Sequence, residues 1–213
     1  LIIFSTSTIT FADEPADFGN ISFPTSATGK AQQHFLRGAA ILHSFGWKQA
    51  RVEFQLAQKA DPEFAMAYWG ESLTYNHPLI SEWDRDTPRQ VLERLALTKE
   101  GRLTKAITDR EKGFIAAVEA LFFGSGDTMR RRIAYMQAMR SLHERYPQDE
   151  EVAAHYALSL LMSAGPTGEG HRQNVLAASI AMDLSRRNPL HPGAVHYTIH
   201  ALDDPFHAPL ALS

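Results

Sequence analysis

The chain of 213 residues contains no cysteine. Disulfides, iron–sulfur clusters, thiolate zinc sites and cysteine nucleophiles are therefore excluded, and any metal site must use imidazole and carboxylate ligands. A basic surplus is also lacking, because 21 Lys and Arg residues stand against 24 Asp and Glu, and the formal net charge is −3. This balance argues against nucleic acid as the main partner, since nucleic-acid-binding domains usually carry excess positive charge.

Strand signals and long apolar runs are scarce as well. The sequence has no sustained alternation of apolar and polar residues and no Asn-Gly or Asp-Gly hairpin turn. The uncharged stretch over residues 1–12 is too short to span a bilayer, so we expect no membrane span in the mature chain. Hydrophobic residues make up 44% of the chain, which is enough to build a buried core.

The N-terminal stretch has the features of a targeting segment. Residues 1–12 fit the h- and c-regions of a secretory signal peptide, with Thr10-Phe11-Ala12 as a small-x-small cleavage site. A plain N-terminal arm is the alternative. We expect residues 1–12 to be a signal remnant and residues 13–29 to be an extended segment. Because the chain starts at Leu1 and stops inside an expected helix, we also expect it to be a fragment.

Helical signals dominate from residue 29 onward. Apolar residues recur at helical spacing, Thr108-Asp-Arg-Glu111 has the spacing of a capping box, and Asp127 suits an N-cap. The pattern predicts an all-α fold with helices over residues 29–45, 47–60, 64–75, 89–98, 108–123, 127–146, 149–163, 171–187 and 192–202.

One stretch matches a known repeat unit. Its residues have the spacing of positions 8, 11, 20, 24, 27 and 32 of the 34-residue tetratricopeptide repeat, and they are Gly38, Ile41, Ala50, Phe54, Ala57 and Pro62. Small residues at positions 8 and 20 let two helices approach, the aromatic residue at 24 fills the gap to the next repeat, and proline ends the second helix. His34 and Arg37 depart from the pattern at positions 4 and 7.

Two later segments, Arg145-Tyr-Pro147 and Arg187-Asn-Pro189, repeat the order of helix, proline and helix. We therefore expect a tetratricopeptide-like solenoid over residues 30–213, made of stacked antiparallel helix pairs in a right-handed superhelix.

Three strings carry a family resemblance, and they are Ala65-Met-Ala-Tyr-Trp-Gly70, Thr108-Asp-Arg-Glu111 and Asn188-Pro-Leu-His-Pro-Gly-Ala-Val-His-Tyr-Thr-Ile-His200. Through them the chain resembles a group of long bacterial tetratricopeptide-repeat proteins, many of which have export signals. The resemblance covers most of residues 30–213. It implies the fold and, together with the signal-like residues 1–12, export to a bacterial periplasm. It implies no reaction.

The densest group of possible metal ligands lies near the C-terminal end. His196 and His200 are four residues apart and share one face of a helix. Such a pair can bind Zn²⁺ or Cu²⁺ when a third ligand is near. The predicted metal ligands are His191, His196, His200, Asp204 and His207. A solvated or structural role for these histidines is the alternative.

The repeat frame also predicts a binding surface. Counted from Pro189 as position 32, His196 and His200 fall at positions 5 and 9 of the next helix, which line the concave groove in this class of repeat. The same count from Pro62 gives Trp69 and Leu73. The predicted groove residues are Trp69, Leu73, His77, His196 and His200.

Three functions remain open from the sequence. The first is an interaction scaffold that binds a peptide or protein partner in its concave groove, and we favour it. The second is a Zn or Cu protein that uses the residues from His191 to His207. The third is a metal-dependent enzyme completed by further C-terminal repeats. No residue is predicted to be catalytic.

Overall fold

The computed structural model describes residues 18–79, 84–165, 168–205 and 207–212. These residues form ten α-helices and one short 3-10 helix and contain no β-strand, so the predicted all-α class is confirmed. The elements are α1 (Gly29–His43), α2 (Trp47–Ala60), α3 (Ala65–Leu73), α4 (Asp86–Leu95), α5 (Lys99–Lys105), α6 (Asp109–Phe122), α7 (Thr128–Arg145), α8 (Glu150–Ser163), α9 (Gly168–Arg187), α10 (Pro192–Ala201) and η1 (Ala208–Leu212).

Several helix starts follow from local sequence. The Thr108 side chain accepts a hydrogen bond from the Glu111 N–H while the Glu111 side chain accepts from the Thr108 N–H, which completes the predicted capping box of α6. Asp127 caps α7 as predicted. The short helix α5 was not predicted, and it begins at Thr98, whose hydroxyl accepts from the Gly101 N–H.

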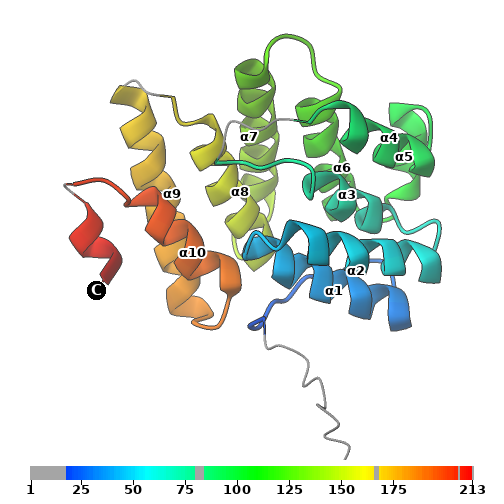
Figure 1. Cartoon of the computed structure of the whole chain (residues 1–213), viewed down its shortest axis with the longest axis horizontal. Coiled ribbons are helices and arrows are strands. Elements are labelled where there is room, and N and C mark those ends of the chain that lie inside the picture. The colour runs from blue at the N-terminus through cyan, green and yellow to red at the C-terminus, as the bar shows by residue number, and fades with distance from the viewer. Residues whose placement is uncertain (1–17, 80–83, 166–167, 206, 213) are drawn as a thin grey trace, which may run out of the picture.

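The helices pack mainly on their neighbours in the chain and form a curved array (Figure 1). α1 contacts α3, α3 contacts α6, and α8 contacts α10, so these helices share the inner side of the array. α1 also contacts α10, although the two are separated by most of the chain. The two ends of the array therefore meet.

Close helix packing around Phe54 agrees with the repeat spacing. The Phe54 ring is fully buried between α1 and α3. A Cβ atom at Gly38 would lie 3.0 Å from this ring, and a Cβ atom at Gly70 would lie 2.3 Å from it. The glycines are needed at both positions because the aromatic ring occupies the space of a side chain.

Two predictions concern the N-terminal residues, namely a signal remnant over residues 1–12 and an extended segment over residues 13–29. The signal-like residues 1–12 are outside the described residues. Residues 18–28 have no regular helix and precede α1. Among the helices of the described residues, none is both long and apolar enough to cross a membrane.

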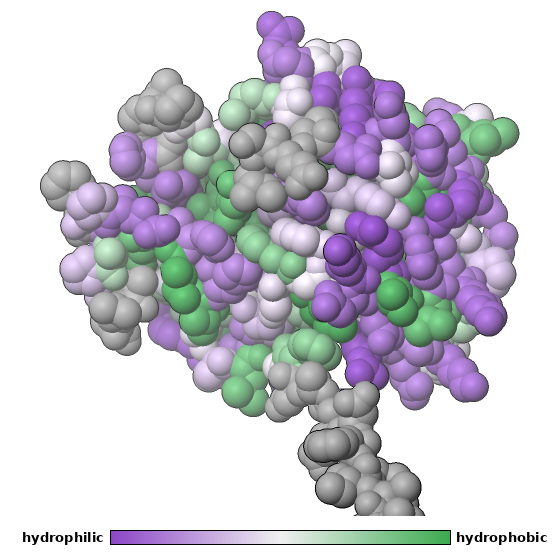
Figure 2. Space-filling model, viewed as in Figure 1, coloured by the Kyte–Doolittle hydropathy of each residue, from purple (hydrophilic) through white to green (hydrophobic). Residues whose placement is uncertain are grey.

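Apolar side chains reach the surface over two helices (Figure 2). Hydrophobic strips lie over α10 and over α2 within a largely hydrophilic surface. The exposed apolar side chains of these helices are Val195 and Ile199 on α10 and Val52 and Leu56 on α2.

We predict that Gly70→Ala lowers the free energy of unfolding by about 1–3 kcal/mol, because overpacking against a ring that cannot move outweighs the better helix propensity of alanine. Urea unfolding followed by circular dichroism measures this change. Gly165→Ala is the control, since a Cβ atom there would meet nothing within 4 Å. Equal stability of Gly70→Ala and the unmodified protein would contradict the observed packing around Phe54.

Candidate functional site

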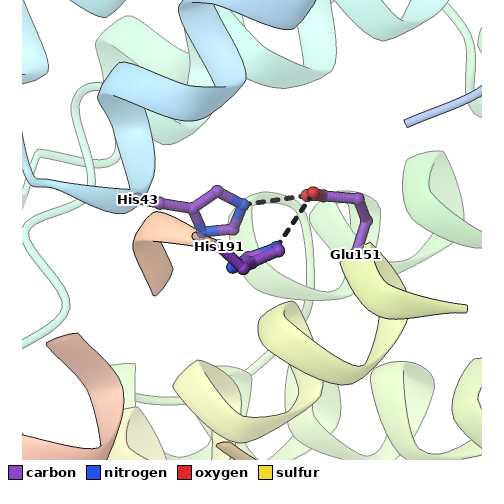
Figure 3. Close-up of side chains that lie close together, drawn as sticks. All are labelled: His43, Glu151 and His191. Carbon is purple, nitrogen blue, oxygen red and sulfur yellow. Dashed lines mark hydrogen bonds and ion pairs between the residues drawn. The ribbon is translucent and has the colours of Figure 1, made fainter. Parts of the chain in front are cut away.

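A buried polar cluster lies where the two ends of the array meet. His43 is the last residue of α1, Glu151 lies in the first turn of α8, and His191 precedes α10 as its N-cap. The three side chains point toward one another (Figure 3). His43 and Glu151 are 0% exposed and His191 is 1% exposed. We call His43, Glu151 and His191 the buried cluster.

The Glu151 carboxylate bridges the two imidazoles. Its Oε2 lies 2.8 Å from His43 Nε2, and its Oε1 lies 3.1 Å from His191 Nε2. The Gly193 N–H donates to His191 Nδ1 at 3.1 Å. Because Nδ1 accepts this bond, the proton of neutral His191 sits on Nε2, which donates to Glu151. Each carboxylate oxygen is therefore held by a different helix end.

Tyr197 extends the buried cluster on the other side of His43. The Tyr197 hydroxyl lies 2.8 Å from His43 Nδ1. Tyr197 is 1% exposed and comes from α10. Both nitrogens of His43 are thereby fixed, one by α8 and one by α10, and this orients the ring.

His155 lies one helical turn beyond Glu151 on α8 and is 2% exposed. Its ring centroid is 5.0 Å from that of His43. Neither of its nitrogens has a hydrogen-bond partner among the described residues. A cavity of about 20 Å³ borders His155, Asn76 and Tyr135, and such a volume has room for about one water molecule. His155 is thus a buried polar group with unused bonding capacity.

Burial and charge act against each other in this region. Burial lowers the pKa of His155 to about 3, so its imidazole is neutral at pH 7. Burial also lowers the pKa of His43, although Glu151 opposes that change. For Glu151, burial raises the pKa, but attraction to His43 and hydrogen bonds from His191 and His43 outweigh it and hold the pKa well below its usual range. Glu151 is therefore ionised at neutral pH.

The structure divides the predicted metal ligands into three groups. His191 belongs to the buried cluster. His196 and His200 face each other with their Nε2 atoms 3.1 Å apart. His207 Nδ1 lies 2.7 Å from Asp204 Oδ2. Among the described residues, the one set of three close metal-ligating groups is His43, Glu151 and His191, so the predicted five do not meet at one point.

The His196 and His200 pair has its own support. His196 Nδ1 donates to the His43 carbonyl oxygen at 2.6 Å, which leaves Nε2 without a proton in the neutral ring. The Phe45 ring packs against His196 with a centroid distance of 4.3 Å. Both histidines are half-buried.

The predicted groove residues do not form one open surface. Trp69 is 0% exposed and Leu73 is 6% exposed, so both belong to the core. The indole of Trp69 packs against Phe23, Phe114 and His155. His77 is half-buried and stacks on Trp47 with a centroid distance of 4.9 Å. Trp69 lies on the inner side of the array, and that side is covered.

Residues 18–27 cover the inner side of the array. Phe23 is 1% exposed, and its ring centroid lies 4.9 Å from that of Phe35 and 5.2 Å from that of Phe114. Farther back along the chain, the Asn20 N–H donates to the Leu190 carbonyl oxygen at 2.9 Å. The segment therefore crosses the inner faces of α1, α3, α6 and α8 and reaches the residues before α10. We call residues 18–27 the inner segment.

Sequence reasoning missed His43, Glu151 and His155. His43 and Glu151 are 108 residues apart, and neither belongs to a recognisable motif. One local signal was present, because Glu151 and His155 are four residues apart in a helix of mostly apolar residues. Two polar groups on one face of such a helix predict a buried polar contact.

Comparison with family models, curated protein sequences and solved structures finds no match to the chain.

We predict that the metal-free protein loses stability as the pH falls from about 6.5 toward 3. In this range the unfolded chain protonates His155 and the folded chain does not, so each pH unit costs up to about 1.4 kcal/mol. His43 adds to the loss because its pKa is also lowered. Urea unfolding in the presence of EDTA measures the slope.

His155→Leu should flatten the dependence of stability on pH between about 6.5 and 4, whatever its effect on stability at neutral pH. His171→Leu is the control, because His171 is an exposed histidine on α9. A His155→Leu slope equal to that of the unmodified protein would contradict the assignment of a neutral buried imidazole.

Proposed function

We propose that the protein is a tetratricopeptide-like interaction scaffold that binds an extended segment of a protein partner on its inner face. The observation that carries the proposal is the inner segment, which lies in that position as an extended stretch of the same chain. A surface that holds one extended segment has the chemistry to hold another of similar sequence.

Much of the contact with the inner segment goes to its backbone. Gln32 Nε2 donates to the Phe23 carbonyl oxygen at 2.9 Å, and Arg110 donates to the Pro24 carbonyl oxygen at 3.0 Å. The Ser26 N–H donates to Glu111 Oε1 at 2.8 Å. Such bonds do not depend on the side chains of the bound segment, so they suit a partner of different sequence.

One side chain of the inner segment supplies an anchor. The Phe23 ring fits among aromatic rings from three helices, and the guanidinium carbon of Arg110 lies 4.6 Å from its centroid. Buried aromatic anchors of this kind carry much of the binding energy in protein interfaces. We therefore expect the partner segment to present an aromatic residue, followed by a residue whose carbonyl oxygen reaches Arg110.

Attachment to the scaffold gives the inner segment an advantage over a partner. A tethered segment acts at an effective concentration on the order of millimolar. A free peptide must displace the tethered inner segment, and this competition lowers the apparent affinity of the protein for the peptide. Partner binding then includes the release of residues 18–27, and a change that weakens this segment should strengthen the partner.

We predict that Phe23→Ala raises the affinity of the full chain for a fluorescent peptide of residues 18–28 by at least about tenfold, because the tethered competitor loses its anchor. Fluorescence anisotropy measures the affinity, and circular dichroism establishes that the variant is folded. The same peptide with alanine in place of phenylalanine should bind at least about tenfold more weakly.

The matched control is Leu97→Ala, which shortens an apolar side chain that is 83% exposed and far from the inner segment in sequence. This variant should bind the peptide as weakly as the unmodified protein. The proposal is wrong if folded Phe23→Ala protein binds the peptide no better than the Leu97→Ala control.

A further inference from the structure

We propose that the buried cluster binds a divalent transition-metal ion of the Zn²⁺ class, through one nitrogen each of His43 and His191 and the Glu151 carboxylate, with His155 as the fourth ligand. The site differs from the ligand set expected from the sequence, of which it keeps His191 alone.

The donor set suits such an ion. Two imidazoles and one carboxylate are common zinc ligands in proteins that lack thiolates at the site. One ligand atom from each of the three residues lies within 4.8 Å of the others. Both Nε2 atoms already point at the carboxylate (Figure 3). These nitrogen and oxygen atoms are now 2.8 and 3.1 Å apart, so each pair must move slightly apart to admit an ion at ligand distances of about 2.0–2.2 Å.

His155 is the independent observation that points to a ligand. Its side chain is 2% exposed, and both of its nitrogens are without a hydrogen-bond partner among the described residues. Its ring lies beside that of His43, with centroids 5.0 Å apart. Buried polar groups are rarely left without partners, because their lost hydration is not replaced. The nitrogens of His155 lie outside the set of ligand atoms within 4.8 Å of one another, so His155 would have to move toward the ion, where coordination would give it the partner that it lacks.

The surroundings supply outer contacts. When His43 Nε2 exchanges its contact with Glu151 for the ion, its ring proton moves to Nδ1, which can then donate to the Tyr197 hydroxyl. Contacts of this kind orient metal-ligating histidines. His191 must change more, because its Nδ1 accepts from the Gly193 N–H. Coordination through Nε2 moves the proton of the neutral ring to Nδ1, so this hydrogen bond is exchanged for the metal bond. The Gly193 amide is thus a reporter of metal binding.

The burial of the site determines how the ion enters. His43, Glu151 and His191 come from three separate parts of the chain and are at most 1% exposed. The ion therefore binds as the chain folds, when α1 meets α8 and α10, and it would join both ends of the array. Loading requires folding in the presence of the metal rather than addition to the folded protein.

Two other arrangements compete with this proposal. The buried cluster is complete as a metal-free hydrogen-bond network except for His155, whose partner could be a water molecule in the adjoining cavity. The ion could instead bind between His196 and His200, whose Nε2 atoms are 3.1 Å apart. The experiment below distinguishes all three.

The full chain without a histidine tag is refolded from denaturant with excess Zn²⁺, separated from free metal, and examined by elemental analysis. We expect about one Zn²⁺ per chain that survives dialysis against a weak chelator. Refolding with Co²⁺ should give the intense visible absorption of four-coordinate nitrogen and oxygen ligation. Retention of no metal, or a Co²⁺ spectrum of six-coordinate ligation, would overturn the proposal.

Variants assign the ligands. Glu151→Gln and His155→Gln keep the side-chain size and should each weaken Zn²⁺ binding by at least about tenfold, whereas His200→Ala should leave it unchanged. Loss of metal in His200→Ala but not in Glu151→Gln would place the ion at the other pair and overturn the proposal. A folded metal-bound His155→Gln variant with unchanged affinity would remove His155 from the site.

Should the buried variants fail to fold, the unmodified protein still decides the question. Nitrogen-15 NMR of the Zn²⁺-refolded and the metal-free protein compares the Gly193 amide with the amides of α5, which lies elsewhere in the array. A large shift of the Gly193 resonance with unchanged α5 resonances supports the site. Identical spectra for the two forms would overturn it.

Discussion

The ionised carboxylate of Glu151 is the interaction on which the arrangement of the helices depends. It is 0% exposed and accepts from two imidazoles that belong to opposite ends of the array. An ionised group costs much free energy to bury unless hydrogen bonds and opposite charge compensate for it. The compensation requires the end of α1 and the start of α10 to lie side by side against the first turn of α8, so the polar cluster also specifies how the array closes.

Closure explains why the inner side of the helices is a core rather than an open groove. Because α1 reaches α10, the inner faces of the helices turn toward one another. The inner segment then fills the remaining space with Phe23, and its backbone forms hydrogen bonds with Arg110 and Glu111 of α6. Under the proposed function, the inner segment is the first occupant of the surface that binds a partner. The polar cluster and the inner segment lie on the same surface, since Phe23 packs near His155.

The local features of this fold could be predicted from sequence, and the distant contacts could not. Capping residues such as Thr108 and Asp127 act within one turn, so their spacing identifies the starts of α6 and α7. Gly38 and Phe54 lie in the neighbouring helices α1 and α2, so their contact is short in sequence. The helix α5 escaped prediction because its seven residues contain a glycine and few apolar positions.

The buried cluster needed information that the repeat pattern does not contain. His43 and Glu151 are 108 residues apart, and they meet where α1 and α8 both pack near α10. The repeat pattern places Trp69 in a groove, whereas the inner segment covers its side chain. His191 was singled out for its histidine neighbours, whereas its partners come from α1 and α8.

A double-mutant cycle between His43 and Glu151 tests the central claim most directly. Unfolding free energies of the metal-free protein, His43→Gln, Glu151→Gln and the double variant give the coupling between the two side chains. If the carboxylate holds the end of α1 in place, the coupling energy should be about 1–3 kcal/mol. Additivity of the two substitutions within about 0.5 kcal/mol would contradict the account.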